Sequence, residues 1–279
     1  MMRPATLAGG GAIALWAFLG LLSRAAASIP PLQLTAMSFG VAAVLGLCVL
    51  VARGRLSDLR QAPHAWAHGV GGLFGFHALY FTALAWAPAA QANLINYTWP
   101  LLIVLLAAVL LGLRLTWRHM LGAALGAAGC LLLLGGGGQI SASALPGYLA
   151  AVASAVTWAT YSVLSRRFAA VPTGAVAGFC AASAVLAAAS HVAFEPTVAP
   201  DGAAWLAVLA MGLGPVGGAF FLWDVGMKRG DPRLLGTLAY ATPVASTLLL
   251  CAGGFAAFNA TLLASAVLVA AGGLVAARG

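Results

Sequence analysis

The sequence predicts an all-α integral membrane protein in which ten transmembrane helices form two inverted five-helix repeats, with both termini in the cytoplasm. Three observations carry this prediction: the apolar composition, the distribution of positive charge and an internal repeat. Hydrophobic residues make up 63% of the 279-residue chain and charged residues only 6%, with a mean hydropathy of +1.02. A water-soluble fold cannot bury that much apolar surface, so the surrounding medium is hydrocarbon.

Ten apolar segments are long enough to cross about 30 Å of hydrocarbon, which takes roughly 20 helical residues. The connections between them are short, so consecutive helices run in opposite directions. The ten segments are 6–24, 32–52, 66–86, 90–112, 118–135, 146–165, 173–192, 203–224, 233–252 and 259–277.

Positive charge falls on alternate connections. With the N-terminus in the cytoplasm, twelve of the thirteen Lys and Arg residues lie on the cytoplasmic side and only Arg24 lies outside. An even number of crossings returns the C-terminus to the cytoplasm, so we expect a multi-pass protein of the bacterial inner membrane. The net charge of +8 then sets orientation and attracts membrane lipid, and it does not indicate a nucleic-acid surface.

The second half of the chain repeats the first at a nearly constant offset. Tyr97 and Pro100 recur 143 residues later as Tyr240 and Pro243. Five helices per copy is an odd number, so the second copy enters the membrane from the opposite face, an architecture that recurs in transporters. The predicted units are residues 1–138 and residues 139–279.

The fourth predicted helix combines polar residues with a proline. Asn93, Asn96, Tyr97 and Pro100 occur at i, i+3, i+4 and i+7, which predicts that they share one face. A proline inside a helix bends it and frees a carbonyl, which hydrocarbon tolerates only beside a polar neighbour or a cavity. We expect this face to line a central pathway. The alternative is that the two Asn side chains only join helices through hydrogen bonds.

Aromatic side chains near the middle of several helices form a second group of candidates. At that depth a Trp N–H or Tyr O–H needs a partner in the protein or in a cavity, unlike belt residues at helix ends. Each residue alone could serve helix packing instead, but as a group they suit a flat apolar solute. The candidate substrate-binding residues are Trp16, His77, Tyr80, Asn93, Asn96, Tyr97, Trp99, Trp158, Tyr161, Phe220, Trp223 and Tyr240.

Three further features have simpler explanations. His77 lies near a helix centre without an intramembrane carboxylate, so packing is favoured over proton transfer. Asp224 and Lys228 are spaced for an i, i+4 ion pair at the cytoplasmic boundary, which we favour over direct substrate binding. The four cysteines stand alone without metal-ligand spacing, so no metal site is expected.

Prolines and glycines predict where helices bend. Pro100, Pro215 and Pro243 are the expected kinks. Gly71 and Gly214 lie in the symmetry-related third and eighth helices and are expected to supply flexibility at the gates.

Small residues in the fifth and tenth helices predict close helix contact. Gly122, Gly126 and Gly129 let another helix approach, either as a scaffold within the chain or as a contact between chains. The oligomeric state therefore stays open between a monomer and a homodimer.

The residues also restrict the class of function. The chain has no Ser/His/Asp set, no HExxH and no phosphate-binding loop, so neither enzyme activity nor a cofactor is expected. A channel would normally need a charged ring or a carbonyl filter, which favours an alternating-access carrier over a channel-like facilitator. With few intramembrane charges, the substrate is expected to be a small amphipathic molecule and not a strong anion.

From Trp16 through Tyr97-Thr98-Trp99-Pro100 to the small-residue tenth helix, the chain resembles the drug/metabolite transporter superfamily and, within it, the ten-helix EamA-type carriers. The resemblance covers the full length of the chain. Within the family, the chain looks most like the aromatic amino-acid exporters. It implies export of phenylalanine, tyrosine and tryptophan, with broad-specificity drug or metabolite export as the alternative. Many relatives have a Gly-Glu pair at the end of the fourth helix, whereas this chain has Gly112-Leu113, so coupling through that carboxylate is not implied.

Overall fold

The computed structural model describes residues 4–134, 142–255 and 257–279. These residues form α-helices joined by short loops, and no β-strand occurs among them. The all-α prediction is therefore confirmed. The predicted boundary between the two repeats, at residues 138 and 139, lies outside the described residues.

In the part of the chain that the structure describes, seven helical stretches are long and apolar enough to cross a membrane. Two further apolar helices, Trp99–Leu111 and Ala260–Ala276, are shorter. The seven stretches are Pro4–Ala25, Pro31–Ala52, Pro63–Trp86, Ala142–Leu164, Ala175–Phe194, Gly202–Arg229 and Pro232–Ala252.

Six long helices run without interruption within the described residues. Proline occupies the first turn of α3, α4 and α8, where its missing N–H has no partner within the helix. The short 3₁₀ segments η1 (Leu56–Leu59) and η2 (Ala142–Ala144) precede α4 and α8. The six helices are α3 (Pro31–Ala52), α4 (Pro63–Trp86), α7 (Trp117–Leu134), α8 (Leu145–Leu164), α9 (Ala175–Phe194) and α14 (Ala260–Ala276).

The remaining apolar stretches contain breaks in the regular α-helix. The breaks within the predicted helices 90–112, 203–224 and 233–252 lie at the expected kinks Pro100, Pro215 and Pro243, and a further break divides the predicted helix 6–24. Proline explains two of the interruptions, because Pro100 and Pro243 cannot donate to the carbonyl four residues earlier, where the preceding helix ends. Pro215 lies in a π-helical turn, and the first interruption has no proline. The pieces are α1 (Pro4–Trp16) and α2 (Leu19–Ala25), α5 (Ala89–Asn96) and α6 (Trp99–Leu111), α10 (Gly202–Leu213), η3 (Gly214–Gly218) and α11 (Ala219–Arg229), and α12 (Pro232–Leu238) and α13 (Ala241–Ala252).

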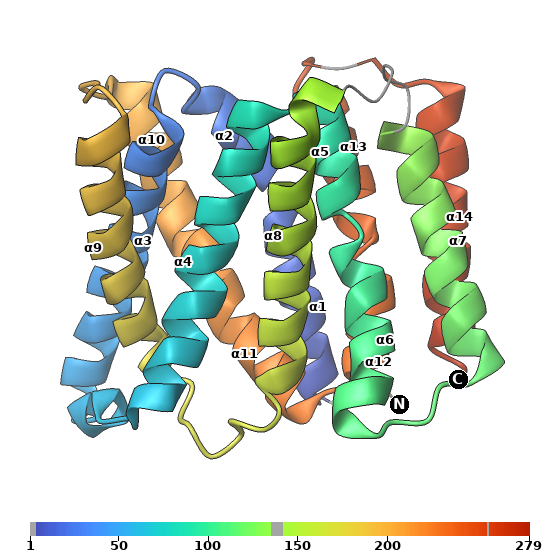
Figure 1. Cartoon of the computed structure of the whole chain (residues 1–279), viewed down its shortest axis with the longest axis horizontal. Coiled ribbons are helices and arrows are strands. Elements are labelled where there is room, and N and C mark those ends of the chain that lie inside the picture. Colours follow the sequence, from blue (N-terminus) through green and yellow to red (C-terminus); the bar gives the residue numbers. More distant parts are fainter. Residues whose placement is uncertain (1–3, 135–141, 256) are drawn as a thin grey trace.

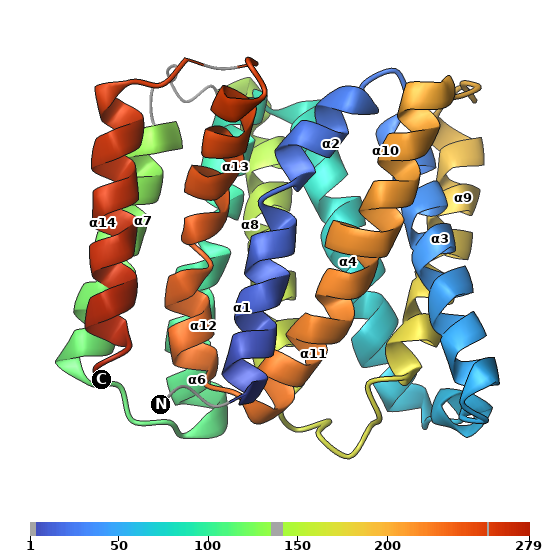
Figure 2. The same ribbon diagram turned by 180° about the vertical axis from the view of Figure 1, so that it is seen from behind.

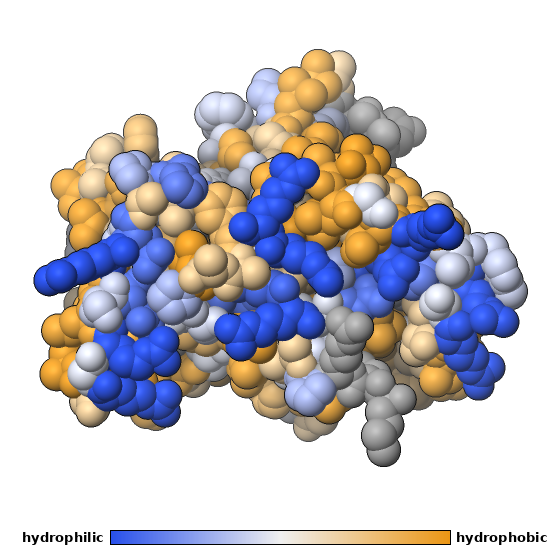
Figure 3. All heavy atoms as spheres, turned by 90° about the horizontal axis from the view of Figure 1, so that it is seen from below, coloured by the Kyte–Doolittle hydropathy of each residue, from blue (hydrophilic) through white to orange (hydrophobic). Residues whose placement is uncertain are grey.

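The helices form one bundle in which consecutive stretches run between two opposite ends (Figure 1). The helix α1 begins and α14 ends at the same end, lowest in Figures 1 and 2, which we call the termini face. Figure 3 looks onto this face, and hydrophilic residues are gathered across it. Arg24, by contrast, belongs to α2 at the opposite end.

The most extensive helix contacts pair α7 with α14, α3 with α9, α4 with α8 and α1 with α11. The pair α3 and α9 forms one side of the bundle and the pair α7 and α14 forms the other, with the interrupted helices between them (Figures 1 and 2). The interruptions are thus concentrated where the bundle is covered on both sides by continuous helices.

Glycine is required where α7 and α14 meet. A Cβ atom on Gly122 would lie 2.6 Å from the carbonyl oxygen of Gly272, and one on Gly129 would lie 2.9 Å from the carbonyl oxygen of Ser265. Because the obstacle is backbone, no side-chain rotation relieves it. The glycines predicted to permit close approach do so within one chain.

Candidate functional site

Four tryptophans meet in the core of the bundle: Trp16 from α1, Trp99 from α6, Trp158 from α8 and Trp223 from α11. All six pairs of their rings are in contact, with centroid separations from 4.9 Å for Trp16 and Trp223 to 6.3 Å. Each is at most 6% exposed. Aromatic pairs at these separations contribute about 0.5–1.5 kcal/mol each beyond area burial. We call these four residues the tryptophan cluster.

Two members of the tryptophan cluster have hydrogen-bond partners inside the protein. The indole N–H of Trp16 donates to the carbonyl oxygen of Pro215 at 2.9 Å, and that of Trp223 donates to Ser162 Oγ at 3.0 Å. Pro215 belongs to the π-helical turn η3, a local distortion that is frequent at functional sites. The distortion of α10–α11 and the position of Trp16 are therefore linked.

A second layer of rings surrounds the tryptophan cluster. Phe220 contacts Trp16 and Trp158 at 6.4 and 5.9 Å and stacks on Phe39 at 5.7 Å. His77 contacts Phe39 edge-on at 5.1 Å, and its Nδ1–H donates to the carbonyl oxygen of Leu73 at 2.7 Å. His77 is thus held by packing and by its own helix. Sequence reasoning missed Phe39, because a single ring in a helix without other aromatic residues gives no pattern.

Two polar pairs join α5 to its neighbours. The Tyr80 hydroxyl donates to Asn93 Oδ1, and Ser154 Oγ donates to Asn96 Oδ1 at 2.8 Å. Asn96 is only 5% exposed, so this amide is inside the protein. The amides therefore face α4 and α8, which also carry rings of the aromatic core.

Tyr97 and Tyr240 lie on the side of the core that faces α7. Both belong to an apolar cluster around Cys130, and a Cβ on Gly126 would meet the Tyr240 ring at 2.5 Å. Tyr97 is also close to Tyr80. The polar residues of the fourth predicted helix therefore have partners on more than one neighbouring helix, because α4, α7 and α8 all contact α5.

The rings between α4 and α8 form a continuous path. From the termini face, Phe168 stacks on His68 at 4.2 Å, and His68 contacts Tyr161 at 4.9 Å. Tyr161 contacts Trp158 at 5.4 Å, which places the tryptophan cluster within the path. The path continues from Trp158 to Phe76 at 5.2 Å and to Tyr80 at 5.8 Å. We call the series Phe168, His68, Tyr161, Trp158, Phe76 and Tyr80 the aromatic path.

A buried ion pair lies beside the first rings of the aromatic path. Asp224 Oδ1 and Lys228 Nζ are 2.8 Å apart, and both side chains are 4% exposed. The predicted i, i+4 pair is confirmed, but it is enclosed by protein and not at a solvated boundary. A cavity of about 10 Å³ adjoins it, lined in part by His68, Tyr161 and Phe168. That volume holds about one water molecule.

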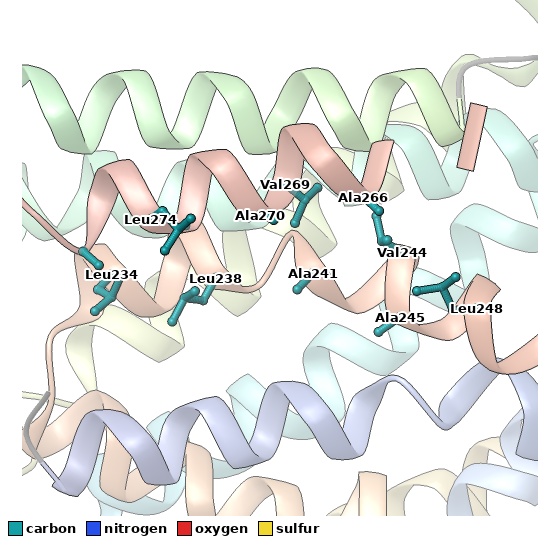
Figure 4. A pocket seen from close by; sticks show the side chains of 12 residues that line it. Leu234, Leu238, Ala241, Val244, Ala245, Leu248, Ala266, Val269, Ala270 and Leu274 are labelled. Carbon is teal, nitrogen blue, oxygen red and sulfur yellow. The ribbon is translucent and has the colours of Figure 1, made fainter. Parts of the chain in front are cut away.

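A larger groove of about 520 Å³ lies along α12–α13 and α14 (Figure 4). Its lining consists of leucine, valine, alanine and glycine, from Leu234 and Leu238 to Leu274. None of the predicted site residues lines it. Because it offers no polar side chain to a charged ligand group, we do not assign the site to this groove.

The predicted gate glycines have different surroundings. A Cβ on Gly71 in α4 would meet no atom within 4 Å, whereas Gly214 begins the π-helical turn beside Leu15. A side chain fits at either position without a backbone clash. Both are therefore usable as probes of flexibility.

Interrupted apolar helices around a buried aromatic core are features of a membrane transporter, and this class is borne out by comparison with known proteins. The chain belongs to the EamA-like transporter family, whose profile matches residues 4–135 and again residues 145–278.

The curated relatives include exporters. The chain is 55% identical over 262 residues to the aromatic amino acid exporter YddG of Ancylobacter novellus, covering 92% of this chain and 91% of that protein. It is 27% identical to YddG of Salmonella typhimurium, covering 88% and 87%. A solved crystal structure with 52% sequence identity superposes with a TM-score of 0.96 and covers 100% of this chain and 98% of its own.

Proposed function

We propose that this protein exports aromatic amino acids across the bacterial inner membrane by alternating access. The observation that carries the proposal is the tryptophan cluster, in which Trp16, Trp99, Trp158 and Trp223 contact one another in the core. Its four members come from four different helices, two in each half of the chain. The identity to aromatic amino acid exporters supports the same substrate class.

In the tryptophan cluster, contacts between two tryptophans can be replaced by contacts between each tryptophan and a substrate ring. An indole or phenyl ring that enters between two of these tryptophans replaces ring–ring contacts with similar ones, so the change in free energy is small. An aliphatic or strongly charged solute offers no such replacement. This exchange supplies selectivity for flat apolar side chains without a large empty cavity.

The proposed architecture is two inverted repeats of five helices, with ten crossings and both termini in the cytoplasm. The family profile matches the chain twice, in two segments of similar length. The extensive contact of α1 with α11 has its counterpart in that of α8 with α4, as expected if the first and sixth helices and the third and eighth are related by symmetry. Most positive residues lie in connections at the termini face, which supports its cytoplasmic placement.

Several arginines join the termini face across helices. Arg166 donates to the Gly230 carbonyl oxygen at 3.0 Å, Arg167 to that of Leu110 at 2.5 Å, and Arg233 to that of Arg114 at 2.7 Å. These bonds connect the ends of α8, α11, α6 and α12. A carrier that opens towards the cytoplasm must break them, so they hold the present conformation closed on this side.

Counterflow in proteoliposomes tests the proposed function. L-Tryptophan on the trans side should accelerate uptake of labelled L-tryptophan, as it does through a carrier and not through an open pore. Trp99→Ala and Tyr97→Ala should each abolish most of this exchange. Trp117→Ala, which removes a tryptophan that is 67% exposed, should not. Full exchange in both Trp99→Ala and Tyr97→Ala would place the site elsewhere.

Cysteine accessibility tests the inverted arrangement. Arg55→Cys and Arg166→Cys should both react with a membrane-impermeant thiol reagent only from the cytoplasmic side, and Arg24→Cys only from outside. The four native cysteines are first replaced by alanine or serine. Labelling of the first two positions from different sides would exclude antiparallel repeats.

A further inference from the structure

The ion pair of Asp224 and Lys228 is buried, and stabilising the fold does not by itself require a buried ion pair. Both side chains are 4% exposed, and the charges are 2.8 Å apart. Bringing two charges into a protein interior is costly, and an apolar pair of the same volume is often as stable. A buried pair in a membrane protein is therefore a candidate for function.

The ion pair adjoins the aromatic path on the termini side of the tryptophan cluster. Asp224 directly follows Trp223, a member of that cluster. Tyr161 of the path lines the same small cavity as Asp224 and Lys228. A ring lying against Tyr161 would thus have one negative and one positive side chain within reach of its substituents.

We propose that Asp224 and Lys228 bind the zwitterionic head of the amino acid as it enters from the cytoplasm. This inference rests on the proposed function. The α-ammonium group replaces Lys228 as the partner of Asp224, and the α-carboxylate replaces Asp224 as the partner of Lys228. One internal ion pair becomes two ion pairs with the substrate, so no charge is left unpaired in the interior.

The helix geometry suits this exchange. Positions i and i+4 on one helix differ by about 6 Å along its axis, because each residue rises about 1.5 Å. Asp224 and Lys228 meet only because their side chains bend towards each other across one turn. When they separate, their charged ends lie about one helical turn apart, beside the small cavity and the first rings of the aromatic path.

The loop between α8 and α9 holds the pair in the closed conformation. Thr173 Oγ1 donates to Asp224 Oδ2 at 2.7 Å, and Lys228 Nζ donates to the carbonyl oxygen of Val171 at 2.8 Å. The adjacent cavity has room for about one water molecule. Movement of this loop, to which Arg166 and Arg167 also belong, therefore exposes the pair and releases its bonds together.

The experiment compares competitors that each lack one charge of the head group. Exchange of labelled L-tryptophan is measured in inside-out vesicles carrying the full-length protein, against unlabelled L-tryptophan, its methyl ester and N-acetyl-L-tryptophan. In the wild type we expect both analogues to compete at least about tenfold more weakly than L-tryptophan, because a site built for a charged group rejects a ligand without it.

Single variants separate the two roles. In Lys228→Met the methyl ester should compete nearly as well as tryptophan, while N-acetyl-tryptophan stays weak. In Asp224→Asn the preference should be the reverse. A structural role would lower exchange for all three compounds without changing their order. Retention of the full wild-type preferences in both variants would overturn the proposal.

Removal of one charge can prevent folding, so the double variant Asp224→Asn/Lys228→Met is also required. This double variant leaves no unpaired charge and should lose both preferences. If its exchange is too slow to measure, the readout is how well each of the three compounds protects the purified protein against thermal unfolding. Arg55→Gln/Asp58→Asn removes a more exposed pair at the same face and should keep both preferences. A wild type that exchanges tryptophan without preference for the free head group would refute this inference alone, whereas a wild type without tryptophan exchange would refute the proposed function.

Discussion

The interrupted helices at the core and the continuous helices α7 and α14 pack against their neighbours in opposite ways. The pair α7 and α14 brings backbones together through glycine, with Gly122 and Gly272 in mutual contact. The core brings large rings together instead, with four tryptophans from four helices, three of which belong to interrupted stretches. Backbone contact between continuous helices has few alternative arrangements, whereas rings can exchange partners.

The interruptions indicate which helices can bend during transport. Among the described residues, proline and the π-helical turn interrupt the regular main-chain hydrogen bonding in stretches that lie between the pair α3 and α9 and the pair α7 and α14. We therefore expect the pair α3 and α9 and the pair α7 and α14 to act as a frame, and the interrupted stretches between them to bend around the aromatic core. Substitutions in the frame should affect folding, and substitutions in the core should affect transport.

The largest expected effect is on folding, from Gly122→Leu in the frame. Its Cβ would lie 2.6 Å from the Gly272 carbonyl oxygen, so the two helices must separate. We expect a loss of stability above the about 1–3 kcal/mol typical of overpacking, and little folded protein in detergent. Gly40→Leu in α3, where a Cβ meets no atom within 4 Å, should express normally. Equal yields of the two variants would argue against a rigid frame.

The largest expected effect on transport comes from Trp158→Ala. Trp158 contacts the other three tryptophans and also Phe76, Tyr161 and Phe220. We expect tryptophan exchange to fall about 100-fold, with a stability loss of about 3–5 kcal/mol, while Trp158→Phe keeps a substantial fraction of both. Exchange rates are normalised to monodisperse protein. Wild-type rates in Trp158→Ala would remove Trp158 from the site.

A smaller effect is expected from Pro215→Ala. The alanine supplies an N–H group that lets η3 adopt a regular α-helix, which shifts the carbonyl group that Trp16 binds. We expect exchange to fall about tenfold with folding retained. Pro146→Ala in the first turn of α8 is the matched control, because its N–H has no intrahelical partner, and its rate should equal the wild type. A similar loss of exchange rate in both variants would mean that the π-helical turn has no particular role in transport.

The smallest expected effect is from Gly71→Leu and Gly214→Leu. Leucine fits at both positions without a backbone clash, so the variants should fold. We expect a reduction of a few-fold in the exchange rate, about 0.5–1 kcal/mol in the barrier, because glycine is more flexible than other residues in a helix. Exchange and expression both at wild-type level would show that these glycines are not hinges.

The fold class and several aromatic residues of the core could be predicted from sequence because hydrophobicity and helical spacing are local. Depth in the membrane makes Trp16, Trp99 and Trp158 candidates, Trp223 follows from the equivalence of the third and eighth predicted helices, and the structure brings all four together. The helix interruption after Trp16 could not be predicted, because no proline marks it. The partners of Asn96 and Tyr97 also depend on which helices surround α5, and that is a property of the tertiary arrangement.

For the ion pair of Asp224 and Lys228, the sequence predicts the contact but not its burial. The spacing of Asp224 and Lys228 predicts their contact, since i, i+4 is local geometry. Their burial depends on the loop between α8 and α9, more than 50 residues away in sequence, which covers them with Thr173 and Val171. The spacing of two residues within one helix does not predict whether a distant loop will bury them.

The most direct test of the account is an experimental structure of the protein with L-tryptophan bound. We predict that the substrate indole lies among Trp16, Trp99, Trp158 and Trp223, and that at least one contact within the tryptophan cluster is replaced by a contact to the substrate. An indole bound in the groove between α12–α13 and α14, with all four tryptophans still in mutual contact, would contradict the account.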